Sequence, residues 1–151
     1  MPALLACADV ALARAASGEL LAQTAALRDA GVNVLWLAPD GPPAAGFSPA
    51  ADAQQMNAAW EREQTPAVAS RAGEDAAAAV PAWVAAQIAA GEFDRILMLA
   101  AGEAFGPAET SLARSLLAAG AEAVELLPIA GLGELSQSWI SGRRAAACLI
   151  A

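Results

Sequence analysis

The stretch best suited to chemistry is FDRILMLAAGEAFGPAETS, which runs from Phe93 to Ser111. Its apolar first half predicts a buried strand, and its polar second half, which opens with Pro107, predicts the start of a helix. The turn between the two contains Gly102. In nucleotide-binding α/β proteins such a turn follows a parallel strand and lies against the cofactor. Gly102 is therefore a candidate cofactor-binding residue.

A second turn of the same kind, Asp40–Gly41, follows another apolar run. Small ligands of parallel α/β proteins bind at the carboxyl ends of the strands and use the backbone amides of such turns. The two turns thus predict a ligand site at 40–41 and 102–106, with Ser111 or Arg114 nearby. The alternative for Asp40 is a simple turn residue, because Asp is common in turns that contain Gly and Pro.

The helix that is expected to begin near residue 107 offers its backbone N–H groups to an anion. An anion is stabilised at a helix N-terminus by these donors and by the helix dipole. Glu103 and Glu109 lie beside that position in the sequence and would repel an anion.

The absent residue types limit the chemistry more than the present ones do. The sequence contains no His, no Tyr and no Lys, and its eight basic residues are all Arg. Without His there is no Ser–His or Cys–His nucleophile pair and no His metal ligand. Without Lys there is neither a Schiff base nor a P-loop lysine. No two carboxylates have a spacing that indicates an acid–base site, so we expect no catalytic residues and no metal site.

The two cysteines, Cys7 and Cys148, each lie inside an apolar run. This setting predicts two buried thiols, because a reduced, buried Cys packs as a small apolar residue. A disulfide stays open as an alternative if the first and last strands are neighbours in the sheet.

Length and charge narrow the class of protein. The chain has 151 residues, a usual size for one domain, so we expect residues 1–151 to form a single domain. The net charge is −8 and there is no basic stripe, which argues against nucleic acid and an anionic membrane surface as partners. We expect neither a membrane span nor a signal peptide, because the sequence has no suitable apolar run, and hence a cytoplasmic protein.

Strand and helix signals alternate along the chain. Apolar runs predict strands at 3–7, 32–39, 93–100 and 143–151. Helical spacing predicts helices at 17–31, capped by Ser17 and closed by Gly31, at 107–119, and around 58–63. This alternation predicts an α/β fold, an open, mostly parallel Rossmann-like sheet of about five strands with helices on both faces.

Some segments leave alternatives open. Residues 73–92 fit a long helix, but Pro81 either kinks that helix or begins it. Residues 123–130 fit a strand or a helix segment, and 131–142 contain a turn and one helical stretch. The Pro- and Gly-rich segment 40–52 is expected to be a loop.

With these elements placed, the chain resembles the nucleotide-binding half of a short-chain dehydrogenase/reductase. The resemblance is most specific over 72–111, where GEFDRILMLAAG is similar to the family's G-x-[IF]-D-x-L-[VI]-x-N-A-G strand and turn. The family's Asn-Asn-Ala-Gly falls on Leu99–Gly102. Only the Ala and Gly match, so the hydrogen bonds that the two Asn make near the cofactor and in the sheet are absent.

The family's glycine-rich T-G-x-x-x-G-x-G turn falls on CADVALARAASGEL, where only Gly18 corresponds to a glycine of the motif. Glycines there let the backbone turn tightly and approach the pyrophosphate of NAD(P). The resemblance also implies an acidic residue that holds the adenosine ribose, and Asp40 has that place. The family's catalytic Tyr-x-x-x-Lys would follow the strand at 143–151, and this sequence has no Tyr or Lys.

Residues 72–111 also resemble the C-terminal half of the host-attachment protein family, which carries G-[RK]-F-D-R-L-V-L-V-A-P. The N-terminal half of that family does not fit the helix expected at 17–31. The resemblance to the dehydrogenase family covers more of the chain in outline.

Two functions follow from these observations. The first is a non-catalytic dehydrogenase-like subunit without a cofactor, which supports or regulates an active short-chain dehydrogenase in an NAD(P)-dependent oxidoreductase complex, or forms a homo-oligomer. Trp60, Trp83 and Trp139 are its candidate interface anchors, although Trp83 also fits an ordinary core position. The second is a small-ligand or nucleotide-binding domain that uses the turns at 40–41 and 102–106. A third alternative is a stand-alone structural or regulatory domain, which differs from the dehydrogenase-like subunit only in having no partner.

Overall fold

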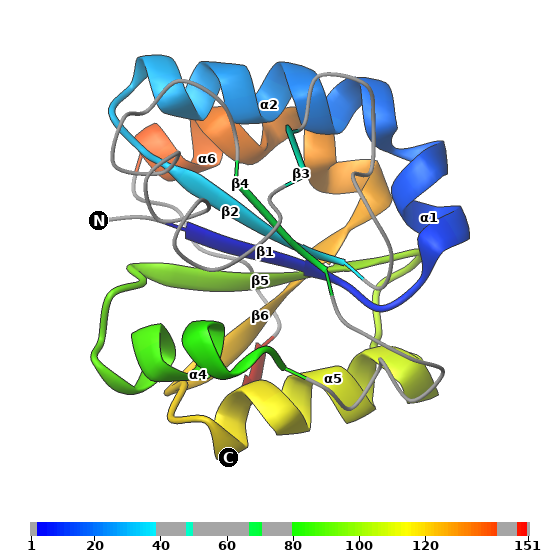
Figure 1. Cartoon of the computed structure of the whole chain (residues 1–151). Coiled ribbons are helices and arrows are strands. Elements are labelled where there is room, and N and C mark those ends of the chain that lie inside the picture. The colour runs from blue at the N-terminus through cyan, green and yellow to red at the C-terminus, as the bar shows by residue number, and fades with distance from the viewer. Residues whose placement is uncertain (1–2, 39–47, 50–66, 71–79, 142–147, 151) are drawn as a thin grey trace.

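The structure is a computed structural model that describes residues 3–38, 48–49, 67–70, 80–141 and 148–150. Within these residues, seven strands form one sheet in the order β3-β4-β2-β1-β5-β6-β7 (Figure 1). The strands are β1 Ala3–Cys7, β2 Val34–Ala38, β3 Ser48–Pro49, β4 Ala67–Ser70, β5 Arg95–Ala100, β6 Ala123–Pro128 and β7 Cys148–Ile150.

The strand order is that of a doubly wound α/β protein. From β1 the chain moves outward to β2 and β4, and it then returns to the other side of β1 to form β5 and β6, all parallel. The predicted Rossmann-like open sheet is thus confirmed. The described residues add two strands to the expected five, the two-residue β3 and the four-residue β4. The last strand, β7, runs antiparallel to β6.

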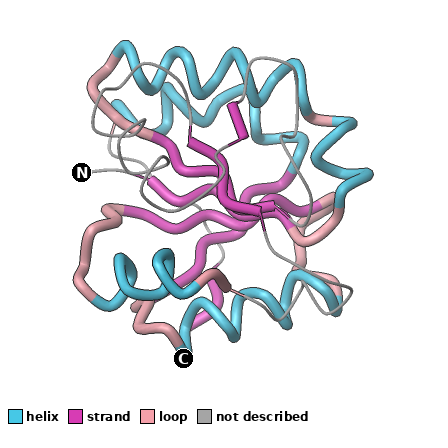
Figure 2. Tube along the Cα trace, in the orientation of Figure 1, coloured by secondary structure: helices cyan, strands magenta, loops and turns pink. Residues whose placement is uncertain are grey.

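Helices cover both faces of the sheet, with α2 and α6 on one face and α4 and α5 on the other (Figures 1 and 2). The helical segments are α1 Val10–Ala15, α2 Ser17–Asp29, α4 Ala82–Ala89, α5 Pro107–Ala118, the 3-10 helix η2 Ile129–Glu134 and α6 Leu135–Ile140. Because both faces are covered, every residue of β1 and β5 is buried.

Several predicted boundaries need correction. The helix expected at 17–31 is α2, but a helix that the sequence did not predict, α1, comes directly before it. Ser17 is therefore the first residue of α2 and not its cap, which is Ala16. Gly31, which follows the C-cap Ala30, has a φ of 88°, as its predicted closing role requires.

The ambiguous segments are also decided. Pro81 is the N-cap of α4, which fits a helix that begins at this proline, while 73–79 lie outside the described residues. Residues 123–130 form β6 and then enter η2, so the strand alternative is confirmed. The helical stretch expected within 131–142 is α6.

The two cysteines lie on strands that are not neighbours. β5 and β6 separate β1, which carries Cys7, from β7, which carries Cys148. Three strand spacings amount to about 14 Å, whereas a disulfide needs Cα atoms within about 7 Å. The disulfide alternative therefore fails, and Cys7 is a fully buried thiol.

Three predictions fall outside the described residues: the ligand turn at Asp40–Gly41, the helix around 58–63, and Trp60. Among the described helices, none combines the length and the apolar character needed to cross a membrane.

Candidate functional site at the switch point

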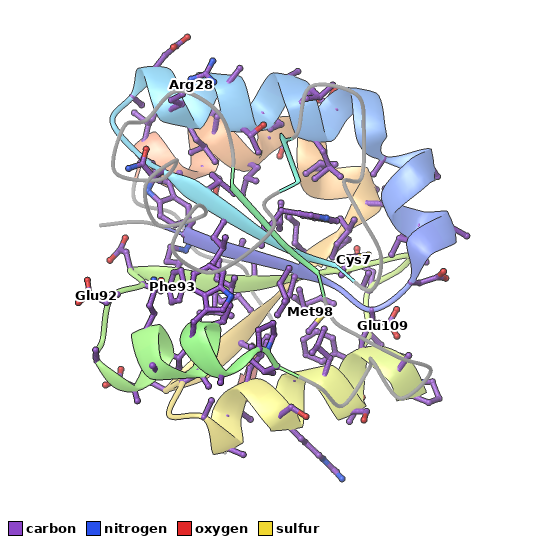
Figure 3. The ribbon with its side chains drawn as sticks, viewed as in Figure 1. Cys7, Arg28, Glu92, Phe93, Met98 and Glu109 are labelled. Carbon is purple, nitrogen blue, oxygen red and sulfur yellow. The ribbon has the colours of Figure 1, made fainter. Side chains whose placement is uncertain are left out.

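The carboxyl ends of β1 and β5 are adjacent, and the chain leaves them in opposite directions. Cys7 at the end of β1 is in register with Leu99 of β5, and the strands that follow lie on opposite sides of this pair. Open α/β sheets bind their ligands at such a topological switch point. Cys7 and Glu109 lie at this edge of the sheet in Figure 3.

On the β1 side, Asp9 closes the turn into α1. Its Oδ1 accepts a hydrogen bond of 2.9 Å from the backbone N–H of Ala11, and its carbonyl oxygen lies 3.0 Å from the Sγ of Cys7. Asp9 thus acts as a helix cap. Its carboxylate lies where a dinucleotide-binding protein places the pyrophosphate.

On the β5 side, Ala101–Ala104 are exposed and lead to Gly106, the N-cap of α5. The first residue of the helix is Pro107, as predicted. Glu109 folds back over this end, since a Cβ added to Gly106 would lie 2.8 Å from its Oε2. The carboxylate therefore fills the space beside Gly106, where it is stabilised by the helix dipole.

A shallow, open hollow of about 660 Å³ runs along one side of α5, from Phe105 to Ala118. The hydroxyl groups of Thr110 and Ser111 and the exposed guanidinium of Arg114 line it, together with Phe105 and Gly106. The structure thus brings Ser111 and Arg114 next to the end of the 102–106 turn, as the sequence suggested. The hollow offers donors for a polar ligand beside α5.

Of the three predicted cofactor-binding residues, the structure describes Gly18 and Gly102, which lie in different settings. Gly102 is exposed at the switch point. Gly18 is the second residue of α2, and the whole of α1 separates it from β1, so it does not form the turn after that strand. Asp40 lies outside the described residues.

Asp9 is a residue that the sequence interpretation missed. It directly follows an apolar strand and precedes a segment with helical composition, which is the usual setting of a helix cap. The resemblance of 7–20 to a glycine motif favours a turn in this segment, whereas the structure forms the helix α1 there.

The switch point as a whole is acidic. Asp9, Glu103 and Glu109 surround it, and Arg114 lies further along α5. Among the described residues, no group of three or more His, Cys, Asp or Glu side chains is placed to hold a metal ion. Such an edge repels phosphate and accepts a neutral or cationic group more readily.

Comparison of the chain with protein-family models and with curated proteins finds no match. The resemblance to the short-chain dehydrogenase/reductase family therefore stays a prediction that depends on 72–111. The strand order and the switch point are properties of a fold that many unrelated functions share.

Proposed function

We propose that this chain is a non-catalytic, dehydrogenase-like subunit that supports or regulates an active short-chain dehydrogenase partner. One observation carries the proposal. Both helices that begin at the switch point have a carboxylate of their own chain in the first turn or at the cap, Asp9 for α1 and Glu109 for α5. A pyrophosphate would have to displace these groups and bear their repulsion.

The residue composition of the whole sequence agrees with this proposal. No Tyr, Lys or His is present to transfer a proton in a hydride-transfer reaction. The buried thiol, Cys7, donates to the carbonyl oxygen of Asp9 and has no exposed surface. A catalytic role for this thiol is disfavoured, since reactive thiols are partially exposed and lie in electropositive surroundings.

Helix α6 supplies the surface that we assign to the partner. Ile140, its last residue, is 67% exposed, and it is the exposed large hydrophobic residue of the described part of the chain. Trp83 and Trp139, which the sequence suggested as anchors, are half-buried and pack against the core. Ile140 is therefore a better candidate than either Trp for a contact that forms on complex formation.

The test is to purify the tagged full chain from its source cell and measure its complexes by native mass spectrometry. A stoichiometric complex with a dehydrogenase that carries an intact glycine turn and Tyr-x-x-x-Lys supports the proposal. Ile140→Asp should weaken that complex, whereas Ala130→Asp, at another exposed position, should not. A lone monomer or homodimer contradicts the proposal.

A second candidate function is the binding of a small polar ligand or nucleotide beside α5. The hollow that contains Thr110, Ser111 and Arg114 favours it. Calorimetric titration with NAD⁺, NADP⁺, FMN and ATP tests this function on the purified chain. Saturable binding that is lost in Arg114→Ala would favour ligand binding over the subunit proposal. Arg28→Ala, which changes the net charge equally, is the control and should retain the binding.

A further inference from the structure

A charged pair is buried near the amino ends of β5 and β6, at the opposite end of β5 from the switch point. The Nε of Arg95 donates a 2.8 Å hydrogen bond to Oε2 of Glu125, and its Nη2 donates one of 3.2 Å to Oε1. Only 5% of the Arg95 side chain and 10% of the Glu125 side chain are exposed. The guanidinium also stacks on Trp139 of α6, with Cζ 4.5 Å from the ring centroid.

The guanidinium of Arg95 has more donors than this pair uses. An Arg side chain carries five N–H groups and no acceptor, and the two hydrogen bonds to Glu125 use two of them. In the part of the chain that the structure describes, the other N–H groups have no hydrogen-bond partner. No nitrogen of Arg95 is among the fully buried atoms that lack a hydrogen-bond partner, so these N–H groups reach open space, where water or a ligand can accept their hydrogen bonds.

Arg95 borders a cavity of about 190 Å³ between the strands β5 and β6 and the segment η2–α6 that covers them. Leu97, Leu127 and Leu135 form apolar walls. The lining extends to Glu103 and Glu134, which are exposed and therefore lie at the mouth. The cavity thus combines an inner hydrogen-bond donor, an aliphatic wall and an acidic entrance.

We propose that this cavity binds a small, uncharged aliphatic carbonyl compound, a ketone or an amide, whose oxygen accepts hydrogen bonds from Arg95. The unused groups of Arg95 are donors, so the ligand has to supply an acceptor. Glu125 already neutralises the guanidinium, and Glu103 and Glu134 repel anions, so a carboxylate is disfavoured. The leucine walls favour an aliphatic body. This inference does not rest on the proposed partner, and the cavity shares one residue of its mouth, Glu103, with the switch point.

The test uses the full chain, labelled with ¹⁵N, and pentan-2-one as the probe. We expect a saturable, single-site shift of the indole N–H signal of Trp139 and of the Nε–H signal of Arg95. Butanoate and butylamine, probes of similar size with opposite charges, should bind at least tenfold more weakly. The absence of a saturable shift, or equal affinity for the three probes, would overturn the proposal.

Two variants locate the site. Leu135→Phe leaves both residues of the ion pair in place and fills the cavity, so it should weaken ketone binding at least tenfold. The control, Ile140→Phe, adds the same ring at an exposed position of α6 and should leave ketone binding unchanged. Should Leu135→Phe fail to fold, the double variant Glu103→Gln/Glu134→Gln decides. It should raise butanoate affinity at least threefold with ketone affinity unchanged, and unchanged butanoate affinity would refute this location.

Discussion

The two ends of β5 differ in how the chain satisfies its polar groups. At the carboxyl end, Asp9 and Glu109 cap the helices of the switch point and remain in contact with water. At the amino end, Arg95 and Glu125 are buried, and Arg95 borders a cavity. At the edge where this fold usually binds its cofactors, carboxylates of the chain itself thus occupy the helix N-termini. The buried charged pair, which is the less common arrangement, lies under α6.

The sharpest test of this difference is the neutral substitution Glu125→Gln, which leaves Arg95 buried without a counter-charge. Removing one partner of a buried ion pair costs about 3–5 kcal/mol, so we expect the free energy of unfolding to fall by about that amount. Urea denaturation followed by circular dichroism measures it.

The matched control is the double variant Arg95→Met/Glu125→Leu, which removes both charges and keeps a similar volume. Buried ion pairs replaced by apolar residues are often neutral in stability. The double variant should therefore be more stable than Glu125→Gln alone. A double variant that is less stable than the single one would show that the pair stabilises the fold beyond charge compensation.

The second prediction concerns the attachment of the segment that covers the cavity. The Nε2 of Gln23 in α2 donates hydrogen bonds of 2.9 Å to the carbonyl oxygen of Gly133 and to Glu19, and its Oε1 accepts one of 2.8 Å from the N–H of Ser136. Gln23→Ala removes the partner of two part-buried backbone groups, and the loss of each such hydrogen bond costs about 0.5–1.5 kcal/mol.

Hydrogen exchange is the measurement suited to Gln23→Ala. The amide of Ser136 should exchange faster, whereas amides in β1 and β5 should change only by the loss of global stability. Gln137→Ala, at an exposed position of α6, is the control and should leave this protection unchanged. Unchanged exchange at Ser136 in Gln23→Ala would show that packing alone holds η2 and α6.

The third prediction tests the capped end. Asp9→Ala removes the hydrogen bond to the N–H of Ala11, and the loss of such a cap costs about 1 kcal/mol. Asp9→Asn retains an acceptor and should lose less than half of that amount. Thermal and urea unfolding of both variants provide the comparison, and equal losses would assign the effect of Asp9 to its charge and not to its hydrogen bond.

The sequence predicted the central strands well because a parallel strand that is covered on both faces is a continuous apolar run. Ala3–Cys7 and Arg95–Ala100 both have this pattern. β4 was missed, because Ala67–Ser70 is short and contains one β-branched residue, Val68. The six-residue α1 was missed because the segment was read as a degenerate glycine turn.

The turn at Gly102 was predictable because a turn after a buried parallel strand lies at the carboxyl edge of the sheet. The pair formed by Arg95 and Glu125 was not, since the two residues are 30 positions apart and meet only through the register of β5 and β6. A signal was present, however. Each is a charged residue next to an apolar run, and such residues are rarely buried unless they are paired.

The smallest expected effect on stability belongs to Ile140→Ser. Ile140 is 67% exposed, and a surface substitution of this kind changes stability by about 0.5 kcal/mol or less. If α6 is the partner surface, the same substitution should weaken the native complex at least tenfold while the isolated chain unfolds as before. Parallel measurement of unfolding and of complex abundance separates the two effects, and an unchanged complex would remove α6 from the interface.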